Sequence, residues 1–211
     1  MLGIAIIGGE GPPPEILKKL ALDADLLVAA DSGLIAAEQA GLKPDWVVGD
    51  MDSLADETGG LERLASYPTD RVLRHRPDKD HTDTELALEL LREQGCSEIW
   101  LAGGGGGRTD HLLAIFALFE RENPLITRWL TANEEIFHME SEKTLSAEPK
   151  PGSLVSVFPI GEGPWHAEST GLKWPLNGLT WQRGTFGLSN IASAGPFKIH
   201  SLQGRFLVVL N

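Results

Sequence analysis

The segment from Ser97 to Glu120, "SEIWLAGGGGGRTDHLLAIFALFE", decides how the rest of the chain is interpreted. "SEIWLA" is a short β-type run, and five consecutive glycines follow it. Apolar residues then recur at helical spacing, at Leu112, Ile115, Phe116 and Phe119. The pattern predicts a strand, a glycine loop and a helix, which is the arrangement of an α/β protein.

The glycine loop predicts an anion site. Backbone N–H groups and a helix N-terminus converge there, usually on a phosphate, and the planar fork of Arg108 suits phosphate oxygens. A P-loop is excluded, because Lys and then Ser or Thr must follow its last glycine, whereas Arg108 and Thr109 follow Gly107. The dinucleotide fingerprint read from Gly103 would need glycine at position 108. The alternative is a flexible linker, but linkers are seldom flanked by an apolar strand and an amphipathic helix.

Upstream of this segment, strand-like and helix-like runs alternate. Strands are predicted at 3–9, 25–31, 45–50 and 98–102, and helices at 12–22, 33–42 and 83–95. Thr82 and Glu85 match a capping box before the last helix, and Gly95 ends it. The alternation predicts a mostly parallel sheet with helices on both faces, which binds ligands at the carboxyl ends of its strands.

Near residue 140 the pattern changes to that of an all-β protein. After a polar connection at 141–153, strands are predicted at 153–158, 165–170, 178–188 and 197–210, with turns at Asn177-Gly178 and Gln203-Gly204. We therefore predict an α/β domain over residues 1–140 and a β-sandwich domain over 141–211. About 70 residues would be marginally stable alone, so this domain should pack on the first domain or on a second copy.

The composition narrows the function classes. A net charge of -12 over 211 residues argues against nucleic-acid binding and fits a cationic ligand or a metal. Cys96 is the only cysteine, which excludes an internal disulfide and a thiolate metal cluster. The N-terminus lacks a basic n-region, and no stretch approaches the roughly 18 apolar residues that span a bilayer. A cytoplasmic protein is the expectation.

Four segments after predicted strands carry acids: "DSG" (31–33), "GDMDS" (49–53), "DKDHTD" (78–83) and "RTDH" (108–111). Asp50 and Asp52 can share one hard cation in a tight turn, and Asp83 could add a third oxygen, which suits Mg²⁺. Each aspartate alone fits a turn or a helix N-terminus. Their recurrence at the same end of successive strands, beside a glycine loop with Arg108, indicates phosphoryl transfer. His111 could be a base or a ligand, or a positioning residue.

In order and spacing, "DSG", "PDWVVGDMDS", "RPDKDHTDTELAL", "GGGGGRTDH", "GLKWPL" and "GLSN" resemble the thiamine pyrophosphokinase family over nearly the whole chain. The resemblance implies an N-terminal catalytic domain and a C-terminal β-sandwich that binds thiamine and forms a homodimer. It also implies active sites shared between the two chains. The reaction would move the β,γ-diphosphate of ATP to the thiamine hydroxyl, giving thiamine diphosphate and AMP, with Mg²⁺.

The resemblance also implies roles for individual residues. The metal and catalytic aspartates would be Asp50, Asp52 and Asp83. Arg108 and Asp110 would complete the catalytic set. The nucleotide would contact Asp31, Lys79, Thr82, Gly105, Gly106, Gly107, Arg108 and His111. Thiamine would contact Ser189 and Asn190.

The chain departs from the family pattern in two places. Lys79 stands where a polar residue of the nucleotide site is expected, and "IASAGPFKI" after Asn190 lacks an aromatic residue for the thiamine ring. Trp165, Trp174 and Trp181 could supply one, or could pack in the β-domain core. Two other functions stay open: a diphosphokinase for another hydroxymethyl heterocycle such as a pterin, and a catalytically silent sensor of thiamine diphosphate.

Overall fold

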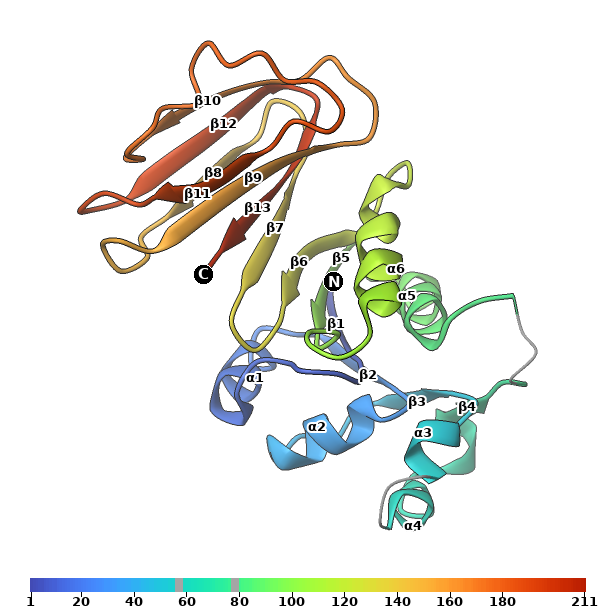
Figure 1. The fold of residues 1–211 in the computed structure, drawn as a ribbon. Coiled ribbons are helices and arrows are strands. Elements are labelled where there is room, and N and C mark those ends of the chain that lie inside the picture. The colour runs from blue at the N-terminus through green and yellow to red at the C-terminus, as the bar shows by residue number, and fades with distance from the viewer. Residues whose placement is uncertain (56–58, 77–79) are drawn as a thin grey trace. The chain divides into compact units, whose positions relative to one another are not determined.

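The structure, a computed structural model, describes residues 1–55, 59–76 and 80–211 (Figure 1). The chain divides into two compact units. The first unit comprises Met1–Leu113 with Trp129–Ala132, and the second comprises Ala114–Arg128 with Asn133–Asn211. The division passes through α6 (Thr109–Glu120) and β6 (Ile126–Leu130). A domain boundary at residue 140 stays a prediction.

A parallel sheet forms the first unit. β1 (Leu2–Ile6) pairs in parallel with β2 (Leu26–Ala30) and β5 (Glu98–Ala102). β2 pairs in parallel with β3 (Trp46–Gly49), and β3 pairs with β4 (Val72–Arg74). β6 lies next to β5 in the strand order. The predicted mostly parallel sheet is confirmed, whereas the sequence pattern did not reveal β4 or β6.

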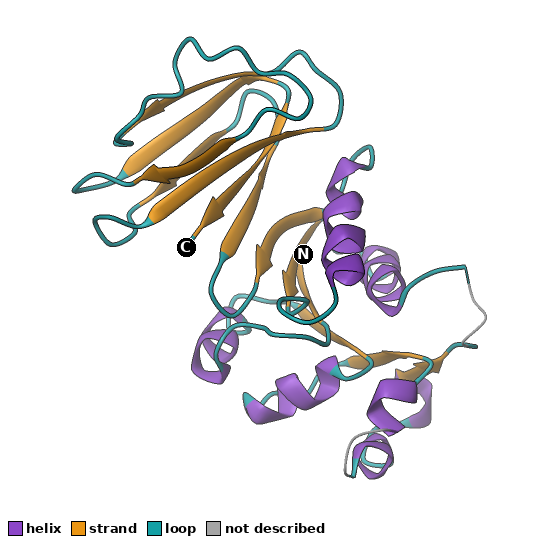
Figure 2. Cartoon of the chain, in the orientation of Figure 1, coloured by secondary structure: helices purple, strands orange, loops and turns teal. Residues whose placement is uncertain are grey.

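Helices cover both faces of this sheet, as predicted (Figure 2). They are α1 (Pro14–Leu20), α2 (Gly33–Gln39), α3 (Asp52–Ala55), α4 (Gly60–Leu64), α5 (Asp83–Glu93) and α6, with a 3₁₀ turn at Thr69–Arg71. Alternate residues of β1 face opposite sides. Ile4 and Ile6 pack with Leu17 of α1. Gly3 faces Leu91 of α5, where an added Cβ would stand 2.6 Å from Leu91 Cδ2.

The second unit is a β-sandwich, which confirms the predicted C-terminal architecture. One sheet has the order β11-β9-β13-β7 and the other β10-β12-β8. The strands are β7 (Glu135–Met139), β8 (Thr144–Ala147), β9 (Leu154–Ile160), β10 (His166–Thr170), β11 (Gly187–Ile191), β12 (Phe197–Gln203) and β13 (Arg205–Leu210). All the named pairings within the two sheets are antiparallel.

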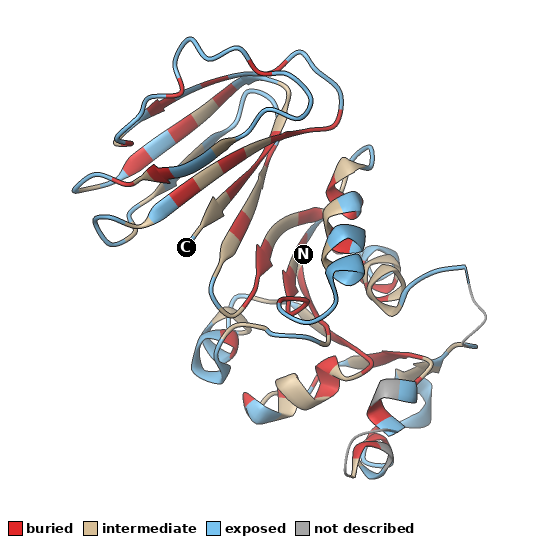
Figure 3. Ribbon diagram, in the orientation of Figure 1, coloured by how far each residue is buried: buried red, intermediate tan, exposed pale blue. Residues whose placement is uncertain are grey.

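Alternation along these strands builds the sandwich core. Val155 and Val157 of β9 are buried with Phe197, Phe206 and their neighbours, whereas the residues between the two valines and before them are more exposed (Figure 3). Apolar side chains on the inner faces therefore hold the two sheets together. Among the described residues, no helix combines the length and the apolar character that a membrane span requires.

One strand and one connection predicted from the sequence are wrong. The strand expected at 178–188 begins only at Gly187 and continues to Ile191, because Gly178 and Gly184 have positive φ angles that interrupt an extended chain. The polar connection expected at 141–153 contains β8, which pairs with β12 and leaves half of its side chains exposed. Exposed edge strands carry polar residues, and this hid the strand.

Candidate active site

Asp31 directly follows β2, and the backbone on either side of it is fixed. Its N–H donates to the carbonyl of Val48 at 2.9 Å, and its carbonyl accepts from the N–H of Leu34 at 3.0 Å. Its φ of 47° lies in the left-handed region, which costs a non-glycine residue about 1–3 kcal/mol and is commonest for Asn and Asp. The residue is 8% exposed. This strained turn therefore fixes where the carboxylate lies.

Asp50 reaches the same edge of the sheet from β3. Ala30 of β2 and Val48 of β3 are register partners in parallel strands, so the chain leaves both strands on one side. Gly49 separates β3 from Asp50 and has a φ of 146°, which an L-residue rarely adopts. The prediction that ligand-binding acids gather at the carboxyl ends of neighbouring strands thus has a structural basis in Asp31 and Asp50.

The third acid, Asp83, is the first residue of α5, and a capping box holds it there. The Thr82 hydroxyl accepts from the N–H of Glu85 at 3.2 Å, and the Glu85 carboxylate accepts from the N–H of Thr82 at 2.9 Å. This confirms the predicted cap. Thr82 was also expected at the nucleotide. Its hydroxyl also donates to Glu85 at 2.9 Å, and its role at the nucleotide stays a prediction.

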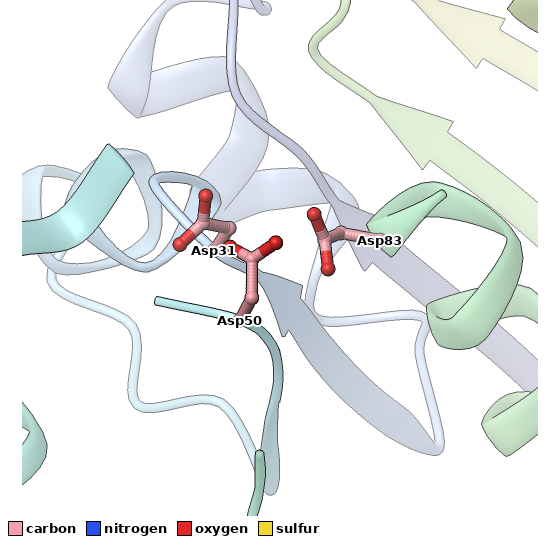
Figure 4. Close-up of side chains that lie close together, drawn as sticks. All are labelled: Asp31, Asp50 and Asp83. Carbon is pink, nitrogen blue, oxygen red and sulfur yellow. The ribbon is translucent and has the colours of Figure 1, made fainter. Parts of the chain in front are cut away.

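The carboxylates of Asp31, Asp50 and Asp83 converge (Figure 4). One oxygen from each lies within 4.8 Å of the others, at a spacing that one metal ion can bridge. Gly49 forms one wall: a Cβ there would stand 3.1 Å from Asp83 Oδ1 and 3.3 Å from Asp31 Cβ. Three anions at this distance repel one another unless a cation lies among them. Carboxylate oxygens are the protein ligands that Mg²⁺ prefers, so the group fits this ion.

Asp52 lies outside this group. Met51 between the two aspartates has a φ of 68° and is buried, with Leu54, in the core of the first unit. Asp52 is therefore exposed at the first residue of α3, and its N–H donates to Asp50 Oδ1 at 3.2 Å. The structure brings Asp31 into the position among the carboxylates that the sequence had suggested for Asp52. A metal-binding role for Asp52 stays a prediction.

The glycine loop has two halves with different surroundings. The N–H groups of Gly103, Gly104 and Gly105 donate to the carbonyls of Leu130, Gly8 and Glu10 at 2.8–2.9 Å. These donors are therefore used within the fold, and a nucleotide contact of Gly105 stays a prediction. Among the described residues, no such bond is formed by the N–H of Gly106 or Gly107, both of which are exposed.

Close packing explains why the first half requires glycine. A Cβ at Gly103 would stand 2.3 Å from the carbonyl oxygen of Ile7, and one at Gly105 would stand 2.6 Å from that of Glu10. The bare backbone therefore lets the loop after β5 pair with the loop after β1. The remaining exposed donors and the start of α6 are what a phosphate could approach.

Arg108 and Asp110 form a two-point ion pair at the start of α6. Arg108 Nε donates to Asp110 Oδ1 at 3.1 Å, and Arg108 Nη2 donates to Asp110 Oδ2 at 2.5 Å. The bond to Arg108 lowers the pKa of Asp110, and the same bond raises the pKa of Arg108. Asp110 thus orients the guanidinium and leaves Nη1 for a further anion. His111 is exposed in the same turn, and its role as base or ligand stays a prediction.

The expected thiamine residues, Ser189 and Asn190, differ in exposure. Ser189 is exposed on β11 with a φ of 54°, and its N–H donates to Ser156 Oγ at 3.1 Å. Asn190 is only 6% exposed. Its side chain bonds to backbone groups of Trp174 and Ile191. Both assignments to thiamine stay predictions, and Ser189 alone of the pair is open to solvent.

The three tryptophans proposed as a platform are also distinguished by burial. Trp165 and Trp181 are each 8% exposed and belong to the sandwich core, where Trp165 Nε1 donates to Ile160 and Trp181 packs edge-on against Phe206. Trp174 is 52% exposed. Lys79, expected at the nucleotide, lies outside the described residues.

Sequence reasoning missed two parts of the site. Gly49 was treated as part of a strand end, although a glycine between a buried strand and an aspartate is a signal for a close approach. Glu10 and the glycines before it follow the first strand as the five glycines follow β5, and this parallel could have indicated that the two loops pair.

Two family models of known proteins match this chain. Residues 17–126 match the family model "Thiamin pyrophosphokinase, catalytic domain", and residues 140–204 match "Thiamin pyrophosphokinase, vitamin B1 binding domain". The chain is 29% identical over 186 residues to thiamine pyrophosphokinase of Bacillus subtilis, covering 82% of this chain and 81% of that one.

Solved structures share the fold. A Bacillus subtilis thiamine pyrophosphokinase structure aligns with a TM-score of 0.81 at 24% identity, covering 99% of this chain and 98% of that one. A thiamin pyrophosphokinase from Geobacillus thermodenitrificans gives 0.76 at 24% identity, covering 100% and 97%. With both family models matched in order along one chain, this protein belongs to the thiamine pyrophosphokinase family of enzymes.

Proposed function

We propose that this enzyme transfers the β,γ-diphosphate of ATP to the hydroxyl of thiamine, releasing AMP. The hydroxyl oxygen attacks the β-phosphorus and loses its proton, and the bond from that phosphorus to the oxygen it shares with the α-phosphorus breaks. The convergence of Asp31, Asp50 and Asp83 within 4.8 Å, at the strand edge that also leads into the glycine loop, carries the proposal. Diphosphate transfer needs positioning and charge neutralisation, which these groups can provide.

In this proposal Asp31, Asp50 and Asp83 hold Mg²⁺. The ion, when bound, neutralises phosphate charge and polarises the phosphoryl group. The fixed backbone at Asp31 and the capped N-terminus at Asp83 keep the carboxylates in place before any ligand arrives. Such preorganisation removes the cost of ordering the ligands during the reaction. Gly49 keeps the space between these carboxylates open.

The nucleotide phosphates would meet the exposed half of the glycine loop. The N–H groups of Gly106 and Gly107 and the Nη1 of Arg108 supply donors there, while Asp110 holds the guanidinium. A charge-assisted bond to phosphate is about twice as strong as a neutral one. The thiazolium of thiamine is a cation, and the net charge of -12 favours its approach.

The decisive experiment identifies both products. The protein is incubated with ATP, Mg²⁺ and thiamine, and the mixture is separated and identified by mass. We expect thiamine diphosphate and AMP in equal amounts. Stoichiometric ADP would mean that only the γ-phosphoryl group is transferred. Turnover of a pterin alcohol without turnover of thiamine would mean that the substrate is the pterin. Binding of thiamine diphosphate without any turnover would indicate a sensor.

We further propose a homodimer whose active sites combine Asp50 of one chain with Ser189 of the other. The family resemblance supports this arrangement, together with the exposed apolar side chains of Leu154 on β9, Leu188 on β11 and Phe186 just before β11. Mixing Asp50→Asn and Ser189→Trp variants under subunit exchange would then place both lesions in one site of each mixed dimer. About half of the dimers are mixed, so roughly a quarter of all sites regain activity. Verified exchange without recovery would exclude shared sites.

A further inference from the structure

Gly103, the first residue of the glycine loop, is held by two neighbouring residues of β6. Its N–H donates to the carbonyl of Leu130 at 2.9 Å, and its carbonyl accepts from Trp129 Nε1 at 2.8 Å. Trp129 is 7% exposed and Gly103 is buried, so both bonds are shielded from water. A buried carbonyl needs a donor, and the indole N–H supplies one to Gly103.

The segment that carries Trp129 supports the loop at a second point. Residues Trp129–Ala132 belong to the first unit, although the residues before and after them belong to the second. Thr131 of this segment is buried, and a Cβ at Gly105 would stand 2.9 Å from Thr131 Cβ. The end of β6 therefore contacts the loop at Gly103 and again at Gly105.

The loop after β1 encloses the same residues from another side. A Cβ at Gly103 would stand 2.3 Å from the carbonyl oxygen of Ile7. The backbones of Gly105 and Glu10 exchange two hydrogen bonds, at 2.7 and 2.9 Å. The first half of the glycine loop therefore lies between the loop after β1 and the end of β6, and Trp129 forms part of that enclosure.

The second half of the loop depends on the first half for its position. Gly106 and Gly107 are exposed and have φ angles of 64° and 65°, in the left-handed region that glycine adopts readily. Consecutive glycines lose much conformational entropy on ordering. Fixing Gly103 before the nucleotide arrives lowers the entropy that is lost on binding, which is the advantage of a preorganised site.

We propose that Trp129 is a positioning residue for the nucleotide. Its indole N–H fixes Gly103 and thereby keeps the exposed N–H groups of Gly106 and Gly107 in place for the phosphates of ATP. This inference rests on the proposed function. It assigns a role in ATP binding to a buried tryptophan that lies outside every motif on which the family resemblance depends, and this role is exerted through the loop.

Trp129→Phe tests the inference in the full-length enzyme, because it keeps a buried aromatic ring and removes the N–H donor. The KM for ATP should rise about 3–10-fold, which corresponds to the loss of one hydrogen bond. The KM for thiamine should stay within about twofold, because the change concerns the phosphate loop. A purely structural role would lower the melting temperature without separating the two KM values.

Trp165→Phe is the matched control. Trp165 is 8% exposed, and its Nε1 donates to the carbonyl of Ile160 at 2.9 Å in the second unit. The same kind of buried bond is therefore lost, and the melting temperature should fall by a similar amount. The KM for ATP should stay within about twofold. An equal rise of this KM in both variants would trace the effect to general destabilisation and would overturn the positioning role.

Amide hydrogen exchange measured by NMR tests the preorganisation in the wild-type protein itself. Without ligand, the N–H groups of Gly103 and Gly105 should exchange slowly, whereas those of Gly106 and Gly107 should gain protection only when ATP and Mg²⁺ are added. In Trp129→Phe, the exchange of the Gly103 N–H should become about 3–10-fold faster. Fast exchange of this N–H in the wild type would overturn the inference without the use of any variant.

The outcomes distinguish this inference from the proposed function. An unchanged KM for ATP in Trp129→Phe, in an enzyme that converts thiamine with ATP, would overturn the positioning role alone. A wild-type protein that does not convert thiamine with ATP would overturn the proposed function and this inference with it. If Trp129→Phe does not fold, Trp129→Tyr fills more of the space of the indole, also lacks its N–H, and enters the same comparison.

Discussion

The group of Asp31, Asp50 and Asp83 and the Ser189–Asn190 segment were both expected to contact substrates, yet they are built differently. In the first, the backbone is fixed by hydrogen bonds and the carboxylates converge. In the second, the Asn190 side chain forms hydrogen bonds with the backbone of a neighbouring segment. A polar residue in a functional motif can therefore serve the site directly or through another residue. Buried amides with most hydrogen bonds made belong to the second kind.

The largest effect should come from removing one carboxylate of the converging group. Asp50→Asn should lower kcat on the order of 10³-fold, because a bound metal supplies several kcal/mol of charge stabilisation. Folding should suffer little, since the change also relieves repulsion among three anions. Steady-state kinetics and melting temperatures with and without Mg²⁺ measure both effects. The stabilisation by Mg²⁺ should disappear with the activity.

Asp52→Asn is the matched comparison. Asp52 lies two residues away, is exposed, and stands outside the group of three. We expect the fold-decrease in kcat to be at least about ten times smaller in Asp52→Asn than in Asp50→Asn. Mg²⁺ should still stabilise the Asp52→Asn variant. Equal losses in both variants would mean that Asp52 joins the metal in the working enzyme, and the set of ligands would have to be extended.

Gly49→Ala should block the space between the carboxylates without changing any charge. A Cβ there would press on Asp83 Oδ1 and Asp31 Cβ, and the φ of 146° adds about 1–3 kcal/mol of strain. We expect the Mg²⁺ concentration for half-maximal activity to rise by about 10-fold or more. Calorimetric titration with Mn²⁺ should show the same loss of affinity.

Gly41→Ala provides the control for backbone strain. Gly41 has a φ of 69° and nothing within 4 Å of an added Cβ, so this variant carries the strain of a positive φ without a steric contact. It should lower the melting temperature and leave metal binding unchanged. A loss of metal affinity in both variants would trace the effect to general destabilisation and would remove the role given to Gly49.

Arg108→Lys should have a smaller effect. Lysine keeps the charge but cannot pair with Asp110 through two nitrogens and still offer a third. Losing one charge-assisted bond at about 1.5–3 kcal/mol predicts a fall in kcat/KM for ATP of roughly 10–100-fold. Kinetics with varied ATP measure this. Wild-type kinetics of the variant would show that phosphate binding does not depend on the guanidinium of Arg108.

Much of the first unit could be predicted from the sequence, because its signals are local. Each local pattern predicts its own local structure: this holds for the apolar runs, for the capping box at Thr82 and Glu85, and for the acids after strands. β8 and the true start of β11 could not be predicted, because edge strands and a bulge depend on partners distant in the sequence. Local pattern fails where tertiary pairing decides.

The same distinction applies to the site. The motif around Asp50 and Asp52 cannot show which aspartate turns toward Asp31, because that follows from the burial of Met51 and its left-handed φ. The five glycines predicted a phosphate loop, yet Gly103 and Gly105 are required by contacts with Ile7 and Glu10, which lie nearly a hundred residues away. A motif shows which chemical groups are present, whereas packing determines where each group points.

The smallest effect on activity at neutral pH, and a clear effect on stability, is expected from His138 in the second unit. The side chain on β7 is 2% exposed, 6.0 Å from the Phe119 ring. Burial, with a smaller contribution from the Arg205 charge, lowers the pKa of His138 to about 4 from its ordinary 6.5. The fold therefore favours the neutral ring. Between about pH 6.5 and pH 4, the imidazole is protonated in the unfolded chain but neutral in the folded chain. The free energy of unfolding therefore decreases by up to about 3 kcal/mol as the pH falls through this range.

His138→Phe tests this pH dependence of stability, because the variant keeps an aromatic ring beside Phe119 and removes the titrating group. The melting temperature of the wild type should fall between pH 6.5 and 4 more steeply than that of His138→Phe. Carboxylates act in both proteins and cancel in the comparison. The variant should keep wild-type activity at pH 7.5, where the ring is neutral in either state. Parallel pH profiles would mean that His138 is protonated without cost, which would contradict the lowered pKa that follows from its burial.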